Sequence, residues 1–168
     1  MPKILALAAL LVPVALALLA LSGCTIARPF AGPGYDRTRG VVAPGAGDTV
    51  VVAVTHAVLG GDGEARRRFW KDTSAVLAGL DDRSGLVGSS VRRRLLGGEA
   101  WTMTVWIDDD SLERFVRSDA HRAAMRSSSD AIAEMRFARV DVPADELPFT
   151  WERALRALDE SNGYAAAR

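Results

Sequence analysis

The order of strand and helix signals over residues 49–158 constrains the fold of this chain more than any other feature. β-Branched or alternating apolar runs indicate strands, whereas apolar side chains spaced three and four apart indicate amphipathic helices. In chain order the signals predict a strand at 49–55, a helix at 64–80, strands at 85–95 and 99–107, a helix that Asp110 caps, a short helix from Ser118 to Ser127, a strand at 135–142 and a last helix at 148–158. This order predicts an α+β, ferredoxin-like β-α-β-β-α-β fold with a four-stranded antiparallel sheet, helices on one face and an extra C-terminal helix.

Local signals place the turns and the helix ends within this order. Gly97-Gly98 predicts the turn of a hairpin between the two middle strands. Asp110 and Glu113 have the spacing of a capping box at the start of a helix. Continuing that helix would bury Asp119, so we expect a break at which Ser118 caps a new, short helix.

An uncharged apolar run, Ile4–Leu21, follows Lys3 and has the layout of a secretory signal. It ends in Leu21-Ser22-Gly23-Cys24, which resembles the lipobox of bacterial lipoproteins. The resemblance implies that residues 1–23 are removed as a signal peptide and that the Cys24 thiol carries a lipid. The alternatives are a plain signal peptide with an incidental cysteine and an uncleaved anchor, because the run is near the lower length limit of a membrane-spanning helix.

These features predict where the protein works and how its mature chain is divided. A lipid on Cys24 would fasten it to a membrane of the bacterial cell envelope on the extracytoplasmic side, and the sequence leaves open which membrane. The chain has a single cysteine, so no intramolecular disulfide can form. Residues 24–48 are rich in Gly and Pro and predict a flexible tether, residues 49–158 predict the folded domain, and residues 159–168 predict a disordered tail.

The charge balance bears on the kind of partner. The chain has 21 basic and 21 acidic residues, and loss of the leader removes Lys3, which leaves a mature net charge of about −1. Nucleic-acid-binding domains usually carry a strong basic excess. We therefore expect no nucleic-acid partner.

The segment Thr102–Met125 resembles the third strand and second helix of antibiotic-biosynthesis-monooxygenase-like proteins. The matching residues are Thr104-Val105-Trp106, Phe115, Ser118-Asp119 and Ala123-Ala124. Together with the order of elements, the likeness extends over residues 49–142. It implies a homodimer, because in this superfamily two sheets pack face to face to form a dimeric α/β barrel.

Within the superfamily the segment is similar to heme-degrading monooxygenases and, more loosely, to spheroidene monooxygenase, so heme is the cofactor that the resemblance implies. Heme-degrading members place a proximal histidine directly after the paired alanines; here Met125 stands there, and His121 lies four residues earlier. His56 falls near the place of an asparagine that hydrogen-bonds bound oxygen, and Phe115 stands where those enzymes have a tryptophan. The resemblance implies His56 and His121 as catalytic candidates, and His121, Met125 and Phe115 as cofactor contacts.

The residues themselves limit this chemistry. His121 and Met125 are four apart and project from one face of a helix, so only one of them can ligate a given iron face, and the neutral imidazole is the natural ligand. The alternative is that His121 lies at a pocket edge or faces water, and that His56 is a structural, hydrogen-bonded histidine. With Cys24 lipidated, two histidines are too few for a zinc site.

Two further sets of side chains are candidates for binding. Arg92 and Arg94 alternate along the second strand and are candidates to bind an anion, such as a heme propionate or a carboxylate substrate, with a solvated face as the alternative. Trp101 and Trp106 are candidates to line an aromatic pocket, with the core or a dimer interface as the alternative.

The sequence supports two functional hypotheses. In the first, the domain is a monooxygenase-like oxidoreductase or heme-binding protein that uses His121 and His56 on a small hydrophobic or aromatic ligand, in a pocket between the sheet and the short helix. In the second, it is a non-catalytic binding or structural lipoprotein that keeps the fold only. The resemblance also implies a route without cofactor, since some superfamily members oxidise electron-rich aromatic substrates that themselves reduce oxygen.

Overall fold

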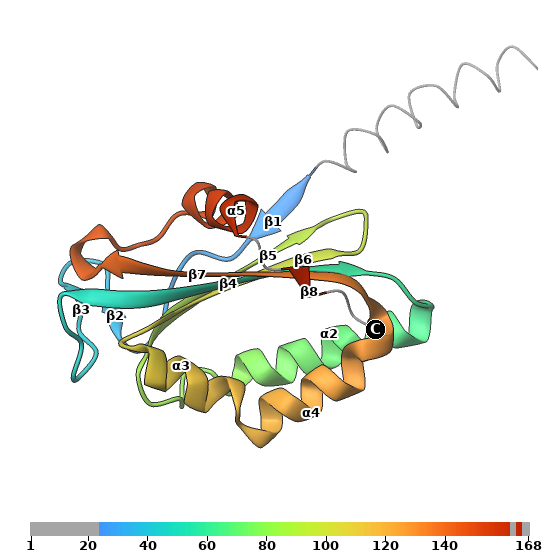
Figure 1. Ribbon diagram of the computed structural model, residues 1–168, viewed down its shortest axis with the longest axis horizontal. Coiled ribbons are helices and arrows are strands. Elements are labelled where there is room, and N and C mark those ends of the chain that lie inside the picture. The colour runs from blue at the N-terminus through green and yellow to red at the C-terminus, as the bar shows by residue number, and fades with distance from the viewer. Residues whose placement is uncertain (1–23, 162–163, 166–168) are drawn as a thin grey trace, which may run out of the picture.

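The computed structural model describes residues 24–161 and 164–165. Its elements, in chain order, are β1 (Thr25–Ala27), β2 (Tyr35–Asp36), β3 (Gly40–Val41), β4 (Thr49–Leu59), α2 (Gly63–Ala78), β5 (Leu86–Arg94), β6 (Glu99–Trp106), α3 (Asp109–Val116), α4 (Asp119–Ser128), the 3-10 turn η1 (Ser129–Ala131), β7 (Ile132–Pro143), the 3-10 turn η2 (Ala144–Glu146), α5 (Trp151–Glu160) and β8 (Tyr164–Ala165). Six strands form one antiparallel sheet in the order β1-β5-β6-β4-β7-β8, as Figure 1 shows.

The central strands β5-β6-β4-β7 and the helices α2, α3 and α4 form the predicted ferredoxin-like α+β arrangement, so the predicted fold is confirmed. The predicted break between two helices is also present, with the Ser118 hydroxyl accepting a hydrogen bond from the His121 backbone N–H. Two helix starts differ from the prediction. Asp108, not Asp110, caps α3, and α5 begins at Trp151 after the cap Thr150, beyond Pro148.

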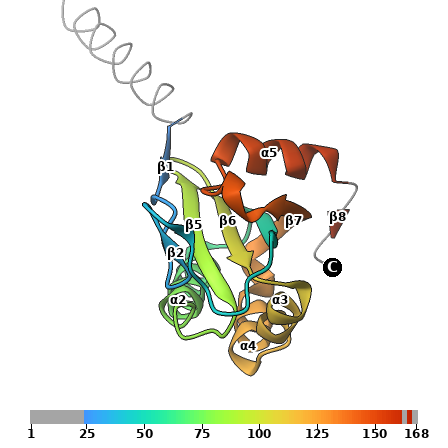
Figure 2. The same ribbon diagram turned by 90° about the vertical axis from the view of Figure 1, so that its left-hand side faces the viewer.

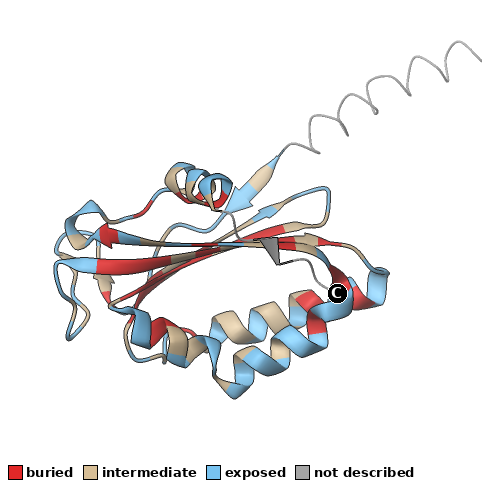
Figure 3. Ribbon diagram, in the orientation of Figure 1, coloured by how far each residue is buried: buried red, intermediate tan, exposed pale blue. Residues whose placement is uncertain are grey.

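The two faces of the sheet carry different layers because successive strand residues point to opposite sides. α2, α3 and α4 cover one face (Figure 1). There, Val51, Leu86 and Trp106 of the sheet pack with Leu80 and Leu112, and Ala57, Ala100 and Met135 pack with Phe69. Figure 3 shows the buried residues concentrated along the strands, with only short buried parts on α2, α3 and α4.

The opposite face of the sheet is covered by α5 (Figure 2), which is the extra C-terminal helix that the sequence predicts. Ala154 and Leu158 of α5 are buried in a core cluster with Phe149 and with side chains of the central strands: Val50, Val52, Val54, Val87, Trp101, Met103, Val105, Ala138 and Val142. The hydrophobic face of a short terminal helix must be buried somewhere, and this sheet face offers the apolar surface. The homodimer stays a prediction. It cannot be argued from an uncovered sheet face, because α5 covers that face.

Residues 24–48 belong to the folded domain, in contrast to the predicted flexible tether. β1 pairs with β5, and the β2–β3 hairpin packs on the core through Tyr35 and Val41. Glycine serves close packing here: a Cβ on Gly32 would lie 2.3 Å from Gly88 Cα, far inside van der Waals contact. A Gly-rich composition therefore reflects backbone contact in this segment as well as a shortage of apolar side chains.

The predicted signal peptide, residues 1–23, lies outside the described residues. The predicted disordered tail begins within α5, which runs to Glu160, and Tyr164–Ala165 pairs with Met135 and Arg136. Within residues 24–161, no helix is both long and apolar enough to cross a membrane.

Candidate functional site

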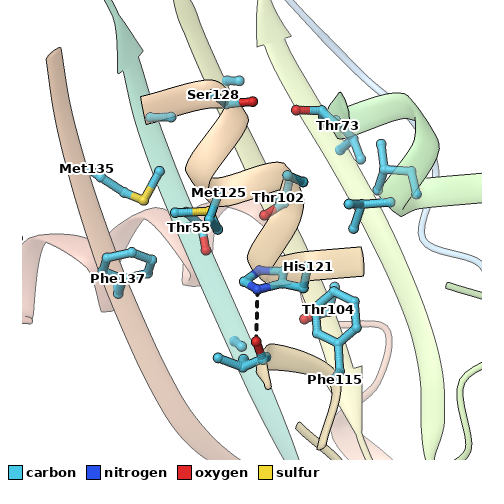
Figure 4. A pocket seen from close by; sticks show the side chains of 18 of the residues that line it. Thr55, Thr73, Thr102, Thr104, Phe115, His121, Met125, Ser128, Met135 and Phe137 are labelled. Atoms are coloured by element: carbon cyan, nitrogen blue, oxygen red, sulfur yellow. Dashed lines mark hydrogen bonds between the residues drawn. The ribbon is translucent and has the colours of Figure 1, made fainter. Parts of the chain in front are cut away.

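A pocket of about 840 Å³ lies between the sheet and the helices α2, α3 and α4. It exists because the strand residues beneath the helices are small: Ala53, Ala57, Ala100 and Thr102 stand where larger side chains would fill the space. Its walls are mostly apolar, and come from Phe69, Trp70, Val76, Leu77, Leu112, Phe115, Val116, Met125, Ile132, Met135 and Phe137. Figure 4 shows this arrangement, with α4 crossing over the strands.

The floor of the pocket offers a few polar groups. Thr55 and Thr102 are cross-strand neighbours on β4 and β6, and both line the pocket. The hydroxyl of Thr104 accepts a hydrogen bond from Trp106 Nε1 at 2.9 Å, whereas Thr73 faces the cavity from α2. Threonine hydroxyls can donate to or accept from a ligand, so they suit a hydroxyl or carbonyl group on an otherwise apolar molecule.

His121 is the one histidine of this pocket within the described residues. Its Nδ1 lies 3.1 Å from the Val116 carbonyl oxygen, and its ring packs at a tilt against Phe115, with centroids 4.9 Å apart (Figure 4). A carbonyl can only accept, so Nδ1 carries the proton and, in the neutral ring, Nε2 has a free lone pair. Burial lowers the pKa of His121, and the hydrogen bond to Val116 opposes that shift in part. The imidazole is therefore held neutral at pH 7.

The mouth of the pocket is marked by apolar side chains that remain exposed. Val116, Met125 and Phe137 are 37%, 37% and 41% exposed and lie on α3, α4 and β7. Arg139 lines the pocket too, but its guanidinium is engaged by Asp109 at 3.1 Å and Glu113 at 2.7 Å. A ligand would thus enter past an apolar rim.

The predicted site residues divide between the two faces of the sheet. His121, Met125 and Phe115 line the pocket together. Trp106 also lies on this face but is fully buried beneath Phe115, with ring centroids 5.1 Å apart, and belongs to the core. His56, Trp101, Arg92 and Arg94 point to the other face, because His56 follows Val52 and Val54 at a spacing of two.

On that other face, the strand register aligns Arg92, Trp101, His56 and Arg136 in one row across β5, β6, β4 and β7. The His56 ring stacks on Trp101 with centroids 4.6 Å apart, and the Arg92 guanidinium lies 5.5 Å from the Trp101 ring centroid. His56 Nε2 is 3.2 Å from Glu99, which Arg94 also contacts at 3.0 Å. His56 and His121 thus cannot act on one molecule in this arrangement.

Several pocket residues were not predicted from the sequence, above all Thr55, Thr102 and Phe137. A signal did exist, since Thr102 and Thr104 alternate with Trp101 and Met103 and so lie on the face opposite them. Which of the two faces the paired helices cover is a tertiary property that alternation does not give.

Comparisons with known proteins bear on the fold. No family model matches the chain, and no curated protein matches it significantly. Among solved structures, a protein from Shewanella oneidensis matches with a TM-score of 0.50 at 7% identity, over 57% of this chain and 93% of that protein. A proposed monooxygenase from Fusobacterium nucleatum also matches with a TM-score of 0.50, at 14% identity over 55% of this chain, which spans only 42% of that protein.

SnoaB, a cofactor-independent oxygenase from Streptomyces nogalater, matches at 17% identity with a TM-score of 0.44, over 61% of this chain and all of that protein. At these identities, the likeness concerns fold. The chain therefore shares its ferredoxin-like α+β fold with these solved structures, and adds a helix across the second face of its sheet.

Proposed function

We propose that this protein is a membrane-anchored lipoprotein whose domain binds a small hydrophobic or aromatic molecule and oxidises it as a monooxygenase-like enzyme. The observation that carries the proposal is the pocket of about 840 Å³, which has mostly apolar walls and is lined by the imidazole of His121. Concave apolar sites with few polar groups are the usual form of a small-molecule site.

His121 supplies the chemistry that the chain itself offers. With Nδ1 donating to Val116, Nε2 can take a proton from an acidic C–H of an electron-rich aromatic substrate. The resulting carbanion can reduce molecular oxygen: a CH₂ group becomes C=O, one oxygen atom stays in the product and the other leaves as water. Thr55 and Thr102 can hydrogen-bond a substrate oxygen while the apolar walls exclude water.

The membrane anchor rests on Leu21-Ser22-Gly23-Cys24 and on the apolar run before it. Cys24 is exposed and directly precedes β1, the edge strand of the sheet. Several acyl chains on one residue would meet the requirement for stable anchoring.

The catalytic proposal is tested with dithranol, an electron-rich anthrone, as the probe. The purified full chain in detergent should bind dithranol and consume oxygen with it faster than buffer does, and His121→Ala should lower the rate at least tenfold. His56→Ala is the matched control, because His56 lies on the other face of the sheet. Equal rates for wild type and His121→Ala would contradict the proposed base. Binding without oxidation would instead favour the non-catalytic lipoprotein.

A second candidate is heme binding, which one contact favours: metal-ligating histidines commonly donate their second ring nitrogen to a carbonyl, as His121 Nδ1 does to Val116. His121 would hold the iron of a bound heme through Nε2. His56, Arg92 and Arg94 would not contact the same heme, because these three residues lie on the other face of the sheet. Heme, when bound, would supply oxygen activation. Hemin titration should then give a Soret band that His121→Ala abolishes. A Soret band that is unchanged in His121→Ala would exclude His121 as the iron ligand.

A further inference from the structure

The start of the mature chain is fixed to one end of the sheet. The Cys24 carbonyl oxygen accepts a hydrogen bond from the Leu95 N–H at 2.9 Å, and the next residues pair with β5 in the register Thr25↔Arg94 and Ile26↔Arg93. Figures 1 and 2 show β1 beside β5, next to the β5–β6 hairpin. Any lipid on the Cys24 thiol is therefore attached within one residue of this hairpin, with no slack chain between.

The same end of the sheet exposes apolar side chains. Ile26 is 48% exposed, and Leu95 and Leu96, in the hairpin turn, are each 42% exposed. We call Ile26, Leu95, Leu96 and Arg93 together the tip. Exposed leucines in a turn cost solvation free energy unless something covers them.

The charge around the tip is mostly positive. Arg93 is exposed and lies opposite Ile26, and Arg94 is partly exposed at the end of β5. The acidic group of this hairpin, Glu99, is already contacted by Arg94 and by His56. Basic residues beside exposed leucines complement a surface of anionic phosphates.

We propose that the tip docks on the surface of a bilayer that contains anionic lipid, with Leu95 and Leu96 among the headgroups and Arg93 beside lipid phosphates. The proposal rests on the proposed lipidation of Cys24 and deepens it: the lipid does not merely tether the domain but holds it in one orientation. The helices α2, α3 and α4 and the pocket between them and the sheet then keep a fixed position relative to the membrane.

The test uses the full chain, expressed in a bacterium and reconstituted in nanodiscs of phosphatidylcholine with phosphatidylglycerol. A bimane label is placed at Leu95→Cys or, independently, at Leu96→Cys, and brominated acyl chains serve as the quencher. Ala120→Cys on α4, across the sheet from β1, is the matched control. We expect at least twofold quenching at positions 95 and 96, none at position 120, and weaker quenching in pure phosphatidylcholine discs or with Arg93→Glu.

Intact mass measured on the same samples separates the two proposals. Acyl mass on Cys24 without quenching at 95 or 96 would overturn the docking and leave the anchoring in place. Quenching with the leader retained would overturn lipidation but support the docking, because the apolar run Ile4–Leu21 ends three residues before Cys24 and would hold the same end of the sheet at the membrane. Equal quenching in both disc types would overturn the preference for anionic lipid, and a blue shift without quenching would show that protein, not lipid, covers the tip.

Discussion

The ring of His121 lies where α3 gives way to α4, held between a carbonyl of one helix and the phenyl ring of Phe115. Three local features set its place: the cap at Ser118, the four-residue spacing to Met125 and the turn that brings Val116 within reach. The result is a half-buried imidazole whose only hydrogen-bonding option toward the cavity is Nε2.

Because burial lowers the pKa of His121, the unfolded chain binds a proton here more readily than the folded chain does. The free energy of unfolding must then rise with pH across the window between the lowered folded pKa and the unfolded value of about 6.5. We expect wild type to lose stability as pH falls through and below that value. His121→Asn should remove this part of the pH dependence in urea titrations from pH 5 to 8. The same slope in both proteins would contradict the burial of a neutral ring.

Single residues also explain the limits of the site prediction. The grouping of His121, Met125 and Phe115 could be predicted, because helix spacing and a helix cap are visible in the local sequence. His56 could be assigned to the face of Val52 and Val54 by alternation, but nothing local indicates that this face is covered by α5 and not by the paired helices. The division of the two histidines between faces is thus a property of tertiary packing.

Among the elements, the segment before β4 differs most from expectation. Its strands are two or three residues long, and it holds to the sheet through backbone contact more than through large side chains. Phe30 reaches Gly88, whose missing Cβ leaves the room: a Cβ there would lie 2.7 Å from Phe30 Cζ. The long strands and helices could be predicted because their periodicity repeats over many residues, whereas this segment has no such repeat.

The close contact between Gly32 and Gly88 predicts the effect of adding one methyl group. In Gly32→Ala the new Cβ would overlap backbone atoms of Val87 and Gly88, which cannot move as a side-chain end can. We expect a loss of roughly 1–3 kcal/mol in the free energy of unfolding and faster hydrogen exchange in β1. The control is Gly47→Ala, since nothing lies within 4 Å of a Cβ at Gly47. Matching stabilities for the two variants would mean that the segment is not packed as described.

At the scale of the whole molecule, three layers stack in the order α5, sheet, and the group α2, α3 and α4 (Figure 2). The sheet carries a cluster of apolar side chains on each face, so each outer layer covers apolar surface that would otherwise be open to water or to another chain. The homodimer predicted from the sequence would place a second sheet on the face that α5 occupies, so a face-to-face dimer would require α5 to leave.

Releasing α5 should therefore change the oligomeric state. Leu158 is 1% exposed against the sheet, and Leu158→Glu would place a charge in that apolar contact. We expect this variant to detach α5 and to dimerise or aggregate, as measured by light scattering on a sizing column with correction for detergent. Glu152→Ala, at an exposed position of the same helix, is the control and should behave as wild type. A monomeric, folded Leu158→Glu protein would show that α5 does not shield this face.

The pairing of β1 with the far end of β5 also sets when β1 can join the sheet during synthesis. β1 leaves the ribosome before every other strand of the sheet, yet its partner is synthesised only after β4 and α2. Cys24 therefore cannot take its place beside Leu95 until β5 has been made. Under the proposed export, this interval would leave Cys24 open to the enzymes that process a lipoprotein precursor, before its carbonyl oxygen accepts the hydrogen bond from the Leu95 N–H.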